Sequence, residues 1–381
     1  MEWKEVRLGD ILNFRRGHDL PHSAMKPGNI PVAGSNGVIG YHDTATPIKP
    51  ILTIGRSGNV GKPYFYEEAW AHNTTLYVDD FKGNDPKFLY YLCQTMPFAN
   101  FGGGSAVPTL NRNHIHPLET KIPVKVEDQR RIASILSSLD RKIELNNKIN
   151  ADLEEMAQAI FKNWFVDFEP FKDGKFVDSE LGMIPEGWKV GRLDEIADVV
   201  GGSTPSKAKP EYYTQKGIAW LTPKDLSNHP AVYTSRGVID ITEEGYNSTS
   251  TKLMPKGTIL FTSRAPIGYI SIAQNDICTN QGFKSLVPKK AGTCFLYCFL
   301  KYVTPEIENK STGSTFKEAS GSLMKSLQVI MPEQKVFEDF ETIVSPLFAR
   351  IESLEKENSR LSLLRDTLLP RLMSGELEVP E

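Results

Sequence analysis

A heptad spacing of apolar residues constrains this 381-residue chain more than any other feature of its sequence. In residues 127–165, two rows of seam positions each recur every seven residues. The rows are Ile132, Leu139, Asn146, Leu153 and Ile160, and Leu136, Ile143, Asn150, Ala157 and Trp164. Neither Pro nor Gly interrupts the segment, so the spacing predicts a coiled-coil helix about 58 Å long. Such a helix buries its seam only against a partner.

The same spacing returns near the C-terminus, in residues 333–372. Its rows are Phe340, Leu347, Leu354, Leu361 and Leu368, and Phe337, Val344, Ile351, Asn358, Arg365 and Leu372. Asn150 and Asn358 fall on equivalent seam positions, and a seam Asn fixes the register of a coiled coil. We therefore expect the two helices to pair. Because a second domain lies between them in the chain, we expect the pair to be antiparallel.

An internal repeat of about 205 residues covers the rest of the chain. Residues 3–11 (WKEVRLGDI) match 188–196 (WKVGRLDEI), and FLYYLC at 88–93 matches FLYCFL at 295–300. In each half, short β-branched runs alternate with Gly, Pro and Asn turns around one helix, predicted at 86–96 and 293–303.

These observations predict a mixed α/β (α+β) fold with a pseudo-two-fold internal repeat. Two similar domains are separated by an antiparallel pair of long coiled-coil helices. The expected divisions are a first domain at 1–126, a central helix at 127–169, a linker and second domain at 170–332, and a C-terminal helix and tail at 333–381.

The net charge of −3 hides an uneven distribution. Residues 1–126 and 184–332 carry 30 Lys and Arg against 24 Asp and Glu, whereas the remaining segments carry 14 against 23. Local positive potential suits contacts with phosphates, although ordinary solvated surface charge explains it as well. The four scattered cysteines form no disulfide framework and, with no long apolar stretch, favour a cytoplasmic protein without membrane contact.

Familiar catalytic motifs are absent from the sequence. It has no phosphate-binding Gly-x-x-x-x-Gly-Lys-Ser/Thr loop and no Asn-Pro-Pro-aromatic tetrad of an amino-methyltransferase. His114 and His116 alternate as in a strand, which favours a polar surface strand over a zinc site. We therefore expect no catalytic residue, no cofactor and no bound metal.

Loops rich in basic and amide side chains are what the two halves share. Arg, Lys, Asn and Gln recognise base edges, while Ser and Thr bind phosphates, although each position is also compatible with an ordinary turn. The candidate DNA-binding residues are Ser35, Asn36, Arg56, Ser57, Asn59 and Lys62 in the first half and Thr222, Lys224, Arg264, Asn280, Gln281, Thr315 and Lys317 in the second. Arg56 and Arg264 stand out because both follow a β-rich run at matching places.

Five segments carry a resemblance to a known family. They are 158–168 (QAIFKNWFVDF), 202–205 (GSTP), 218–225 (IAWLTPKD), 279–284 (TNQGFK) and 363–377 (LLRDTLLPRLMSGEL). Through them the chain resembles the specificity subunits of type I restriction-modification systems over essentially its full length. The first half departs at residues 73–75, where Asn-Thr-Thr stands in place of the Asn-Gln-Gly of 280–282.

The resemblance implies a specificity subunit without a catalytic centre. It implies that two target-recognition domains each bind one half of a split duplex DNA site, with the helices setting their separation. It also implies docking of methyltransferase subunits, two in number, and of restriction subunits. The alternatives are a stand-alone DNA-modifying enzyme and a coiled-coil scaffold that does not bind DNA.

Apolar side chains gather where each long helix ends, in excess of what a two-helix seam buries. We expect them either to pack against the neighbouring domains or to dock the partner subunits. The candidate docking residues are Phe161, Trp164, Phe165 and Phe168 on the first helix and Leu364, Leu369 and Leu372 on the second.

Overall fold

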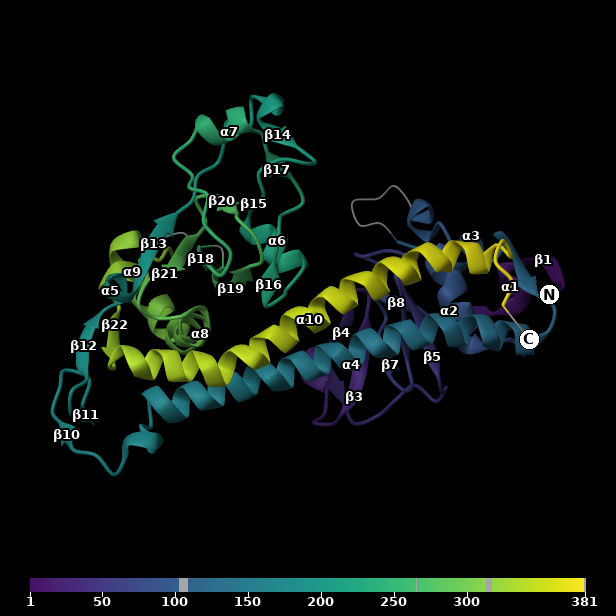
Figure 1. Cartoon of the computed structure of the whole chain (residues 1–381). Helices are drawn as coiled ribbons and strands as arrows, with labels where there is room; N and C mark the ends of the chain where they lie inside the picture. The colour runs from purple at the N-terminus through teal and green to yellow at the C-terminus, as the bar shows by residue number, and fades with distance from the viewer. Residues whose placement is uncertain (103–108, 265, 313–316, 380–381) are drawn as a thin grey trace. The chain divides into compact units, whose positions relative to one another are not determined.

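A computed structural model describes residues 1–102, 109–264, 266–312 and 317–379. The chain divides into two compact units, one formed by residues 1–144 with 358–381 and the other by residues 145–357. The division falls within both long helices, α4 (Val126–Phe165) and α10 (Gln334–Met373), so that each helix contributes one part to each unit (Figure 1). None of the described helices is long and apolar enough to cross a membrane.

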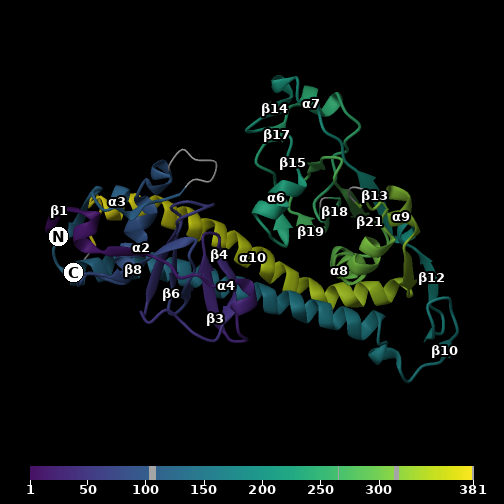
Figure 2. The same ribbon diagram turned by 180° about the vertical axis from the view of Figure 1, so that it is seen from behind.

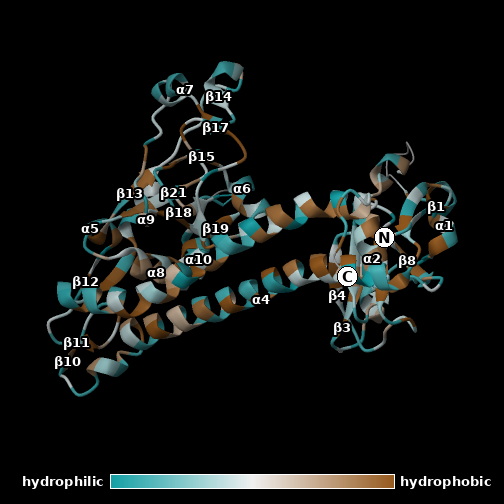
Figure 3. Cartoon of the chain, turned by 45° about the vertical axis from the view of Figure 1, so that its right-hand side comes forward, coloured by the Kyte–Doolittle hydropathy of each residue, from teal (hydrophilic) through white to brown (hydrophobic). Residues whose placement is uncertain are grey.

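The long helices are antiparallel within each unit, as predicted. In the second unit, Asn146 Nδ2 donates to Glu357 Oε2 at 2.9 Å, and the rings of Phe161 and Phe340 lie 6.2 Å apart. In the first unit, Arg365 Nη1 donates to Asp140 Oδ1 at 2.7 Å. Along both helices in Figure 3, brown apolar residues alternate with teal polar ones, as expected when one helical face is buried.

The first unit is built on a four-stranded sheet with the order β2-β8-β5-β6. A three-stranded sheet, β4-β3-β7, and an antiparallel pair, β1-β9, complete its β structure. The strands are β1 (Trp3–Arg7), β2 (Asn13–Arg16), β3 (Ile30–Gly34), β4 (Gly37–His42), β5 (Ile51–Gly55), β6 (Pro63–Tyr66), β7 (Trp70–Ala71), β8 (Thr75–Asp80) and β9 (Glu119–Pro123). The helices besides the long pair are α1 (Leu8–Ile11), α2 (Pro86–Thr95) and α3 (Arg112–Ile115).

Helix α2 joins the first sheet to the long helix α4. Asp85 caps α2, since its side chain accepts a hydrogen bond from Phe88 N at 2.9 Å. Gln129 of α4 in turn accepts from Asp85 N at 2.9 Å. Buried Phe88, Leu92 and Ile132 belong to the same hydrophobic core, so the sheet, α2 and this part of α4 form one packed body.

The second unit is built on a five-stranded sheet with the order β13-β21-β18-β19-β16. Among the described residues of this unit, four two-stranded sheets accompany it. The elements α7, β14 and β17 form the end of the unit farthest from α8 (Figures 1 and 2). The strands are β10 (Phe176–Val177), β11 (Ile184–Pro185), β12 (Lys189–Arg192), β13 (Ala197–Gly201), β14 (Tyr213–Thr214), β15 (Trp220–Leu221), β16 (Tyr233–Thr234), β17 (Asp240–Ile241), β18 (Ile259–Ser263), β19 (Ile267–Ala273), β20 (Cys278–Thr279), β21 (Lys284–Pro288) and β22 (Gln328–Met331). The helices are α5 (Leu193–Ile196), α6 (Pro223–Asn228), α7 (Glu243–Asn247), α8 (Thr293–Lys310) and α9 (Gly321–Ser326).

The internal repeat predicted from the sequence is confirmed by the topology. The order β2-β8-β5-β6 of the first unit corresponds strand for strand to β13-β21-β18-β19 of the second. The pair β1-β9 corresponds to β12-β22, and α2 corresponds to α8. Each unit thus contains the same sheet and helix, and β9 and β22 each lead directly into a long helix.

The prediction of a polar strand through His114 and His116 is wrong. Residues Arg112–Ile115 form the short helix α3, which Asn111 caps by accepting from Asn113 N at 3.0 Å. His116 follows the helix, and its Nε2 accepts a hydrogen bond from Phe14 N at 3.1 Å. The imidazole of His116 therefore has a structural partner within the first unit.

Candidate DNA interface

The candidate residues of the first unit lie on two neighbouring hairpin turns. Ser35 and Asn36 connect β3 to β4, whereas residues 56–62 connect β5 to β6. The two turns touch, because a Cβ placed on Gly58 would lie only 3.5 Å from Ser35 Oγ. The structure therefore brings together side chains that are about 20 residues apart in the sequence.

The turn that follows β5 is tightly closed by its own backbone. Gly55 N donates to Lys62 O at 3.1 Å, and Gly61 N donates to Gly55 O at 2.7 Å. Gly61 has a φ of +82°, a backbone conformation that side-chain-bearing residues rarely adopt. Asn59 and Lys62 are exposed on this turn, while Arg56 and Ser57 are half-buried. Two polar side chains are thus presented to solvent on a fixed backbone.

The candidate residues of the second unit converge on Gly282. Asn280 N donates to Leu221 O at 2.9 Å, which places the loop of Asn280 and Gln281 beside Thr222. A Cβ on Gly282 would lie 2.8 Å from Pro223 Cγ, so the two loops are in close contact. Four candidates, Thr222, Lys224, Asn280 and Gln281, are brought together here.

Arg264 joins this group from the end of β18. Ser263 N donates to Gly282 O at 2.8 Å, so the residue after Ser263 is held at the same place. Arg264 Nη1 lies 3.6 Å from Glu318 Oε2, and the adjacent Lys317 is exposed. Thr315, the remaining candidate, lies outside the described residues.

Some of these side chains also hold the fold together. Asp225 Oδ2 accepts from both the backbone N and the hydroxyl of Thr222, each at 2.7 Å, which fixes Thr222 at the start of α6. Asn280 Oδ1 accepts from Gly282 N at 2.8 Å, which stabilises its own loop. Lys224 and Gln281 are exposed, and Gln281 Oε1 accepts a hydrogen bond from the hydroxyl of Thr204.

Sequence reasoning missed Glu318 and Thr204 at this surface. Thr204 stands in the segment 202–205 that carried the family resemblance, so a signal was present. Glu318 had no such signal, because its position beside Arg264 depends on the pairing of two segments that are more than 50 residues apart.

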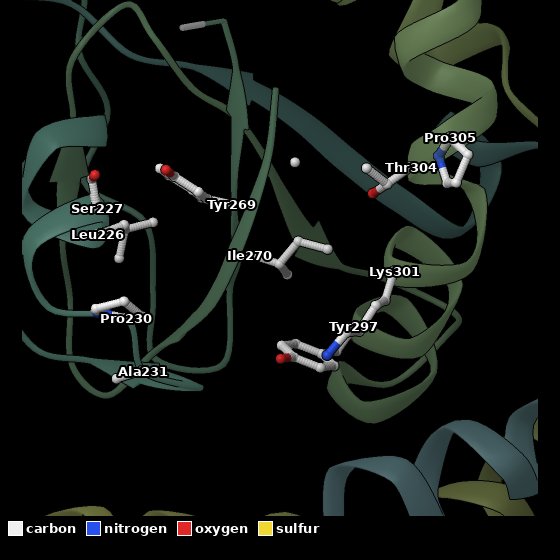
Figure 4. Close-up of a pocket in the computed structure, with 11 residues that line it drawn as sticks. Leu226, Ser227, Pro230, Ala231, Tyr269, Ile270, Tyr297, Lys301, Thr304 and Pro305 are labelled. Atoms are coloured by element: carbon white, nitrogen blue, oxygen red, sulfur yellow. The ribbon is translucent and has the colours of Figure 1, made fainter. Parts of the chain in front are cut away.

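A hollow of about 350 Å³ lies elsewhere in the second unit, between α6, β19 and α8 (Figure 4). Figure 4 shows Tyr297 and Lys301 beside each other on α8. Both side chains bind Glu154 of α4, Tyr297 by a hydrogen bond of 2.6 Å and Lys301 by an ion pair. Tyr297 and Lys301 thus attach α8 to the long helix.

A metal site or a reactive thiol would require specific features of the described residues. Within the described ranges, no three His, Cys, Asp or Glu side chains are grouped so as to hold a metal ion. Burial raises the pKa of the Cys278 thiol to about 11, and it raises the pKa of Cys294 even further. Both thiols are therefore protonated near neutral pH and are poor nucleophiles.

The family model for the type I restriction modification DNA specificity domain matches residues 1–155 and 185–362. The chain belongs to this family. The two matched regions each contain one copy of the internal repeat, so the family's domain occurs here twice.

Individual members of the specificity-domain family align with the chain to different extents. The MjaIX specificity subunit of Methanocaldococcus jannaschii is 40% identical over 190 residues, which cover 49% of this chain and 44% of that protein. The HindI specificity subunit of Haemophilus influenzae is 28% identical and is aligned over 98% of this chain and 94% of its own length. The crystal structure of a type I restriction-modification S subunit from M. genitalium has the same fold, with a TM-score of 0.63, 19% identity, and coverage of 98% of this chain and 96% of that one.

The candidate docking residues of this specificity subunit are placed very differently from one another. Phe161, Phe165 and Phe168 are buried in the core of the second unit, where Phe165 packs against Phe295 at 4.9 Å between ring centroids. For these three, packing against the neighbouring domain is what the structure shows. The reason is that α8 and the beginning of α10 both cover this end of α4.

The remaining docking candidates range from half-buried to exposed. Trp164 is half-buried against the core of the second unit, and Leu369 is half-buried against the core of the first. Leu372 is buried in that first core. Leu364 is 47% exposed and its neighbour Leu363 is 70% exposed. Exposed leucine side chains therefore remain on α10 within the first unit.

Proposed function

We propose that this specificity subunit binds a bipartite duplex DNA site and that each unit recognises one half of it. The observation that carries the proposal is the repeated position of the candidate residues. Arg56 follows β5 in the first unit, Arg264 follows β18 in the second, and these strands are equivalent in the two sheets. In each unit, further polar side chains surround the arginine. A chain that repeats one DNA-binding surface is suited to reading two half-sites.

The chemistry of these surfaces fits DNA recognition. Arginine forms paired hydrogen bonds with guanine O6 and N7, and the amides of Asn and Gln do so with adenine. Lysine and hydroxyl side chains bind phosphates, which position the protein without reading the sequence. Exposed Asn36, Asn59 and Lys62 in the first unit and Lys224, Gln281 and Lys317 in the second supply both kinds of group.

Catalysis belongs, in this proposal, to other subunits. The relatives are named as specificity subunits of type I restriction enzymes, so the catalytic work of such an enzyme falls to its other subunits. We propose that this chain recruits two methyltransferase subunits, one for each copy of the repeat, together with restriction subunits. Leu363 and Leu364, which are exposed on α10, are proposed to take part in this docking.

Selection from a pool of random duplexes tests the DNA-binding proposal. The full chain, alone and with its methyltransferase subunit, is incubated with the pool at a defined salt concentration, because phosphate contacts make affinity salt-dependent. We expect enrichment of two short motifs separated by a spacer of fixed length. Binding without enrichment of any sequence would contradict the proposal.

The same preparation distinguishes the alternatives. Cleavage or methyl transfer by the purified chain alone would support a stand-alone enzyme. Absence of DNA binding, together with self-association through the helices, would support a scaffold.

A further inference from the structure

A carboxylate stands between two cations at the candidate DNA surface of the second unit. Glu318 Oε2 lies 3.6 Å from Arg264 Nη1, and Glu318 Oε1 lies 3.5 Å from Lys284 Nζ. The side chains of Arg264 and Glu318 are 37% and 39% exposed, so DNA can reach both of them, whereas Lys284 is only 17% exposed. An acidic group in this position opposes the binding of phosphates, so its presence needs a reason.

Backbone pairing holds Glu318 in this place. Glu318 N donates to Thr312 O at 2.9 Å, and the next residue, Ala319, donates from its N to Ser263 O at 2.9 Å. Ala319 is fully buried, so the backbone is fixed on the C-terminal side of Glu318 as well. The backbone pairing of Ala319 with Ser263 therefore places Glu318 opposite Arg264, and the ion pairs of Glu318 follow from this placement.

The first unit builds the same backbone arrangement without a carboxylate. There Leu110 N donates to Arg56 O at 2.7 Å, whereas in the second unit Ala319 N donates to the O of Ser263, the residue before Arg264. Thr109, which precedes Leu110, therefore stands in the first unit where Glu318 stands in the second. The side chain of Thr109 carries no charge, and among the described residues Arg56 forms no ion pair. The fold therefore does not require an acidic side chain at this point, which favours a role in binding over a role in folding.

We propose that Glu318 is a specificity-determining residue, and this inference rests on the proposed DNA-binding function. Its carboxylate restrains Arg264 and Lys284 and repels the backbone phosphates of DNA that lacks the correct half-site. At the correct half-site, Arg264 exchanges the carboxylate for the hydrogen-bond acceptors of a base edge. DNA of the wrong sequence offers no such exchange, so the repulsion remains. Glu318 thus lowers binding to wrong DNA more than binding to the correct site.

Neutralising the carboxylate tests the inference. In Glu318→Gln, the two cations are released towards phosphates, and we expect tighter binding to a duplex of unrelated sequence. One additional phosphate contact changes the slope of log K against log salt by about −0.9, which is roughly a threefold larger loss of affinity between 50 and 200 mM salt. The ratio of specific to non-specific affinity should fall by about threefold or more. Circular dichroism checks that the variant is folded.

A matched control separates the local effect from the change in net charge. Glu338→Gln removes the same charge at an exposed position of α10 that forms no ion pair with either cation. We expect this variant to keep the parental salt slope and sequence discrimination. Glu318→Asp, which retains the charge, should also keep a slope close to that of the parent.

A double variant shows whether Glu318 acts through Arg264. In an Arg264→Ala background, Glu318→Gln should have a smaller effect on discrimination at the second half-site than in the parent. If the parent selects a site but Glu318→Gln keeps its slope and discrimination, the inference is wrong while the proposed function stands. If the parent selects no sequence, the proposed function itself fails. Equal effects of Glu318→Gln and Glu338→Gln would also overturn the inference.

Discussion

Arg56 and Arg264 come directly after equivalent strands of the two units but have different surroundings. Both follow the strand that lies third in its sheet order, yet only Arg264 is paired with a carboxylate among the described residues. Each arginine has donors suited to a base edge, so each is proposed to serve its own half-site. Their contributions should therefore be separable by substitution.

Substituting alanine for Arg56 or for Arg264 tests whether each arginine serves its own half-site. Arg56→Ala should weaken recognition of the first half-site only, and Arg264→Ala that of the second. Loss of a base contact typically costs ~1–3 kcal/mol and relaxes the preference at one base pair. Competition binding with duplexes altered in one half-site at a time measures both effects. Unchanged binding by both folded variants would show that these arginines do not contact DNA, and a flatter salt slope with intact preference would indicate a phosphate contact.

At the scale of the element, Glu355 attaches α10 to the edge strand of the second sheet. Its carboxylate accepts from Val232 N at 2.7 Å and from Tyr233 N at 3.0 Å. The pKa of Glu355 is raised to about 7, mainly by burial and also by the nearby carboxylates of Glu154 and Glu352, although the two backbone hydrogen bonds act to lower it. A carboxylate that bridges a helix and a strand is thus close to its titration point at neutral pH.

The raised pKa predicts a pH dependence of stability for the second unit. The folded state binds the proton of Glu355 more tightly than the unfolded state, whose ordinary pKa is 4.5. The contribution of this group to the free energy of unfolding should therefore increase as pH falls from above 7 towards 4.5, by at most about 1.4 kcal/mol per pH unit. Urea unfolding of the parent and of Glu355→Gln between pH 8 and pH 5.5 measures the difference between their free energies of unfolding at each pH. We expect the parent to gain stability relative to the variant as pH falls, whereas Glu338→Gln should follow the parent; a constant difference would contradict the assignment.

Elements with a regular sequence period were predictable from the sequence, whereas irregular ones were not. The heptad spacing predicted a helix from residue 127, and α4 begins at Val126, because the spacing directly reflects which helical face is buried. The alternation at His114 misled the prediction, since two residues cannot distinguish a strand from one helical turn. The aromatic cluster around Phe165 was recognised, but its burial depends on α8, which comes from a distant segment of the chain. Contacts between segments that are distant in the chain, such as that of Glu318 with Arg264, produce no pattern in the local sequence.

At the scale of the whole molecule, both units share the same two helices. The boundary between the units falls after Glu144 in α4 and after Glu357 in α10. These positions face each other, since Asn146 is hydrogen-bonded to Glu357. Residues inserted at both positions therefore lengthen the paired helices without altering either candidate DNA surface. If the helices determine the distance between the half-sites, such an insertion must change the spacer.

A matched insertion of one heptad in each helix tests this relation. Seven residues keep the seam in phase and add about 10.5 Å of helix, which corresponds to roughly three base pairs of B-DNA. We expect the selected site to keep both half-site sequences and to gain a spacer longer by about that number. Insertion into α4 alone should misalign the seam rows and lower the melting temperature, which provides the control. A variant that is folded, binds both half-sites and retains the parental spacer would show that the helices do not set the distance.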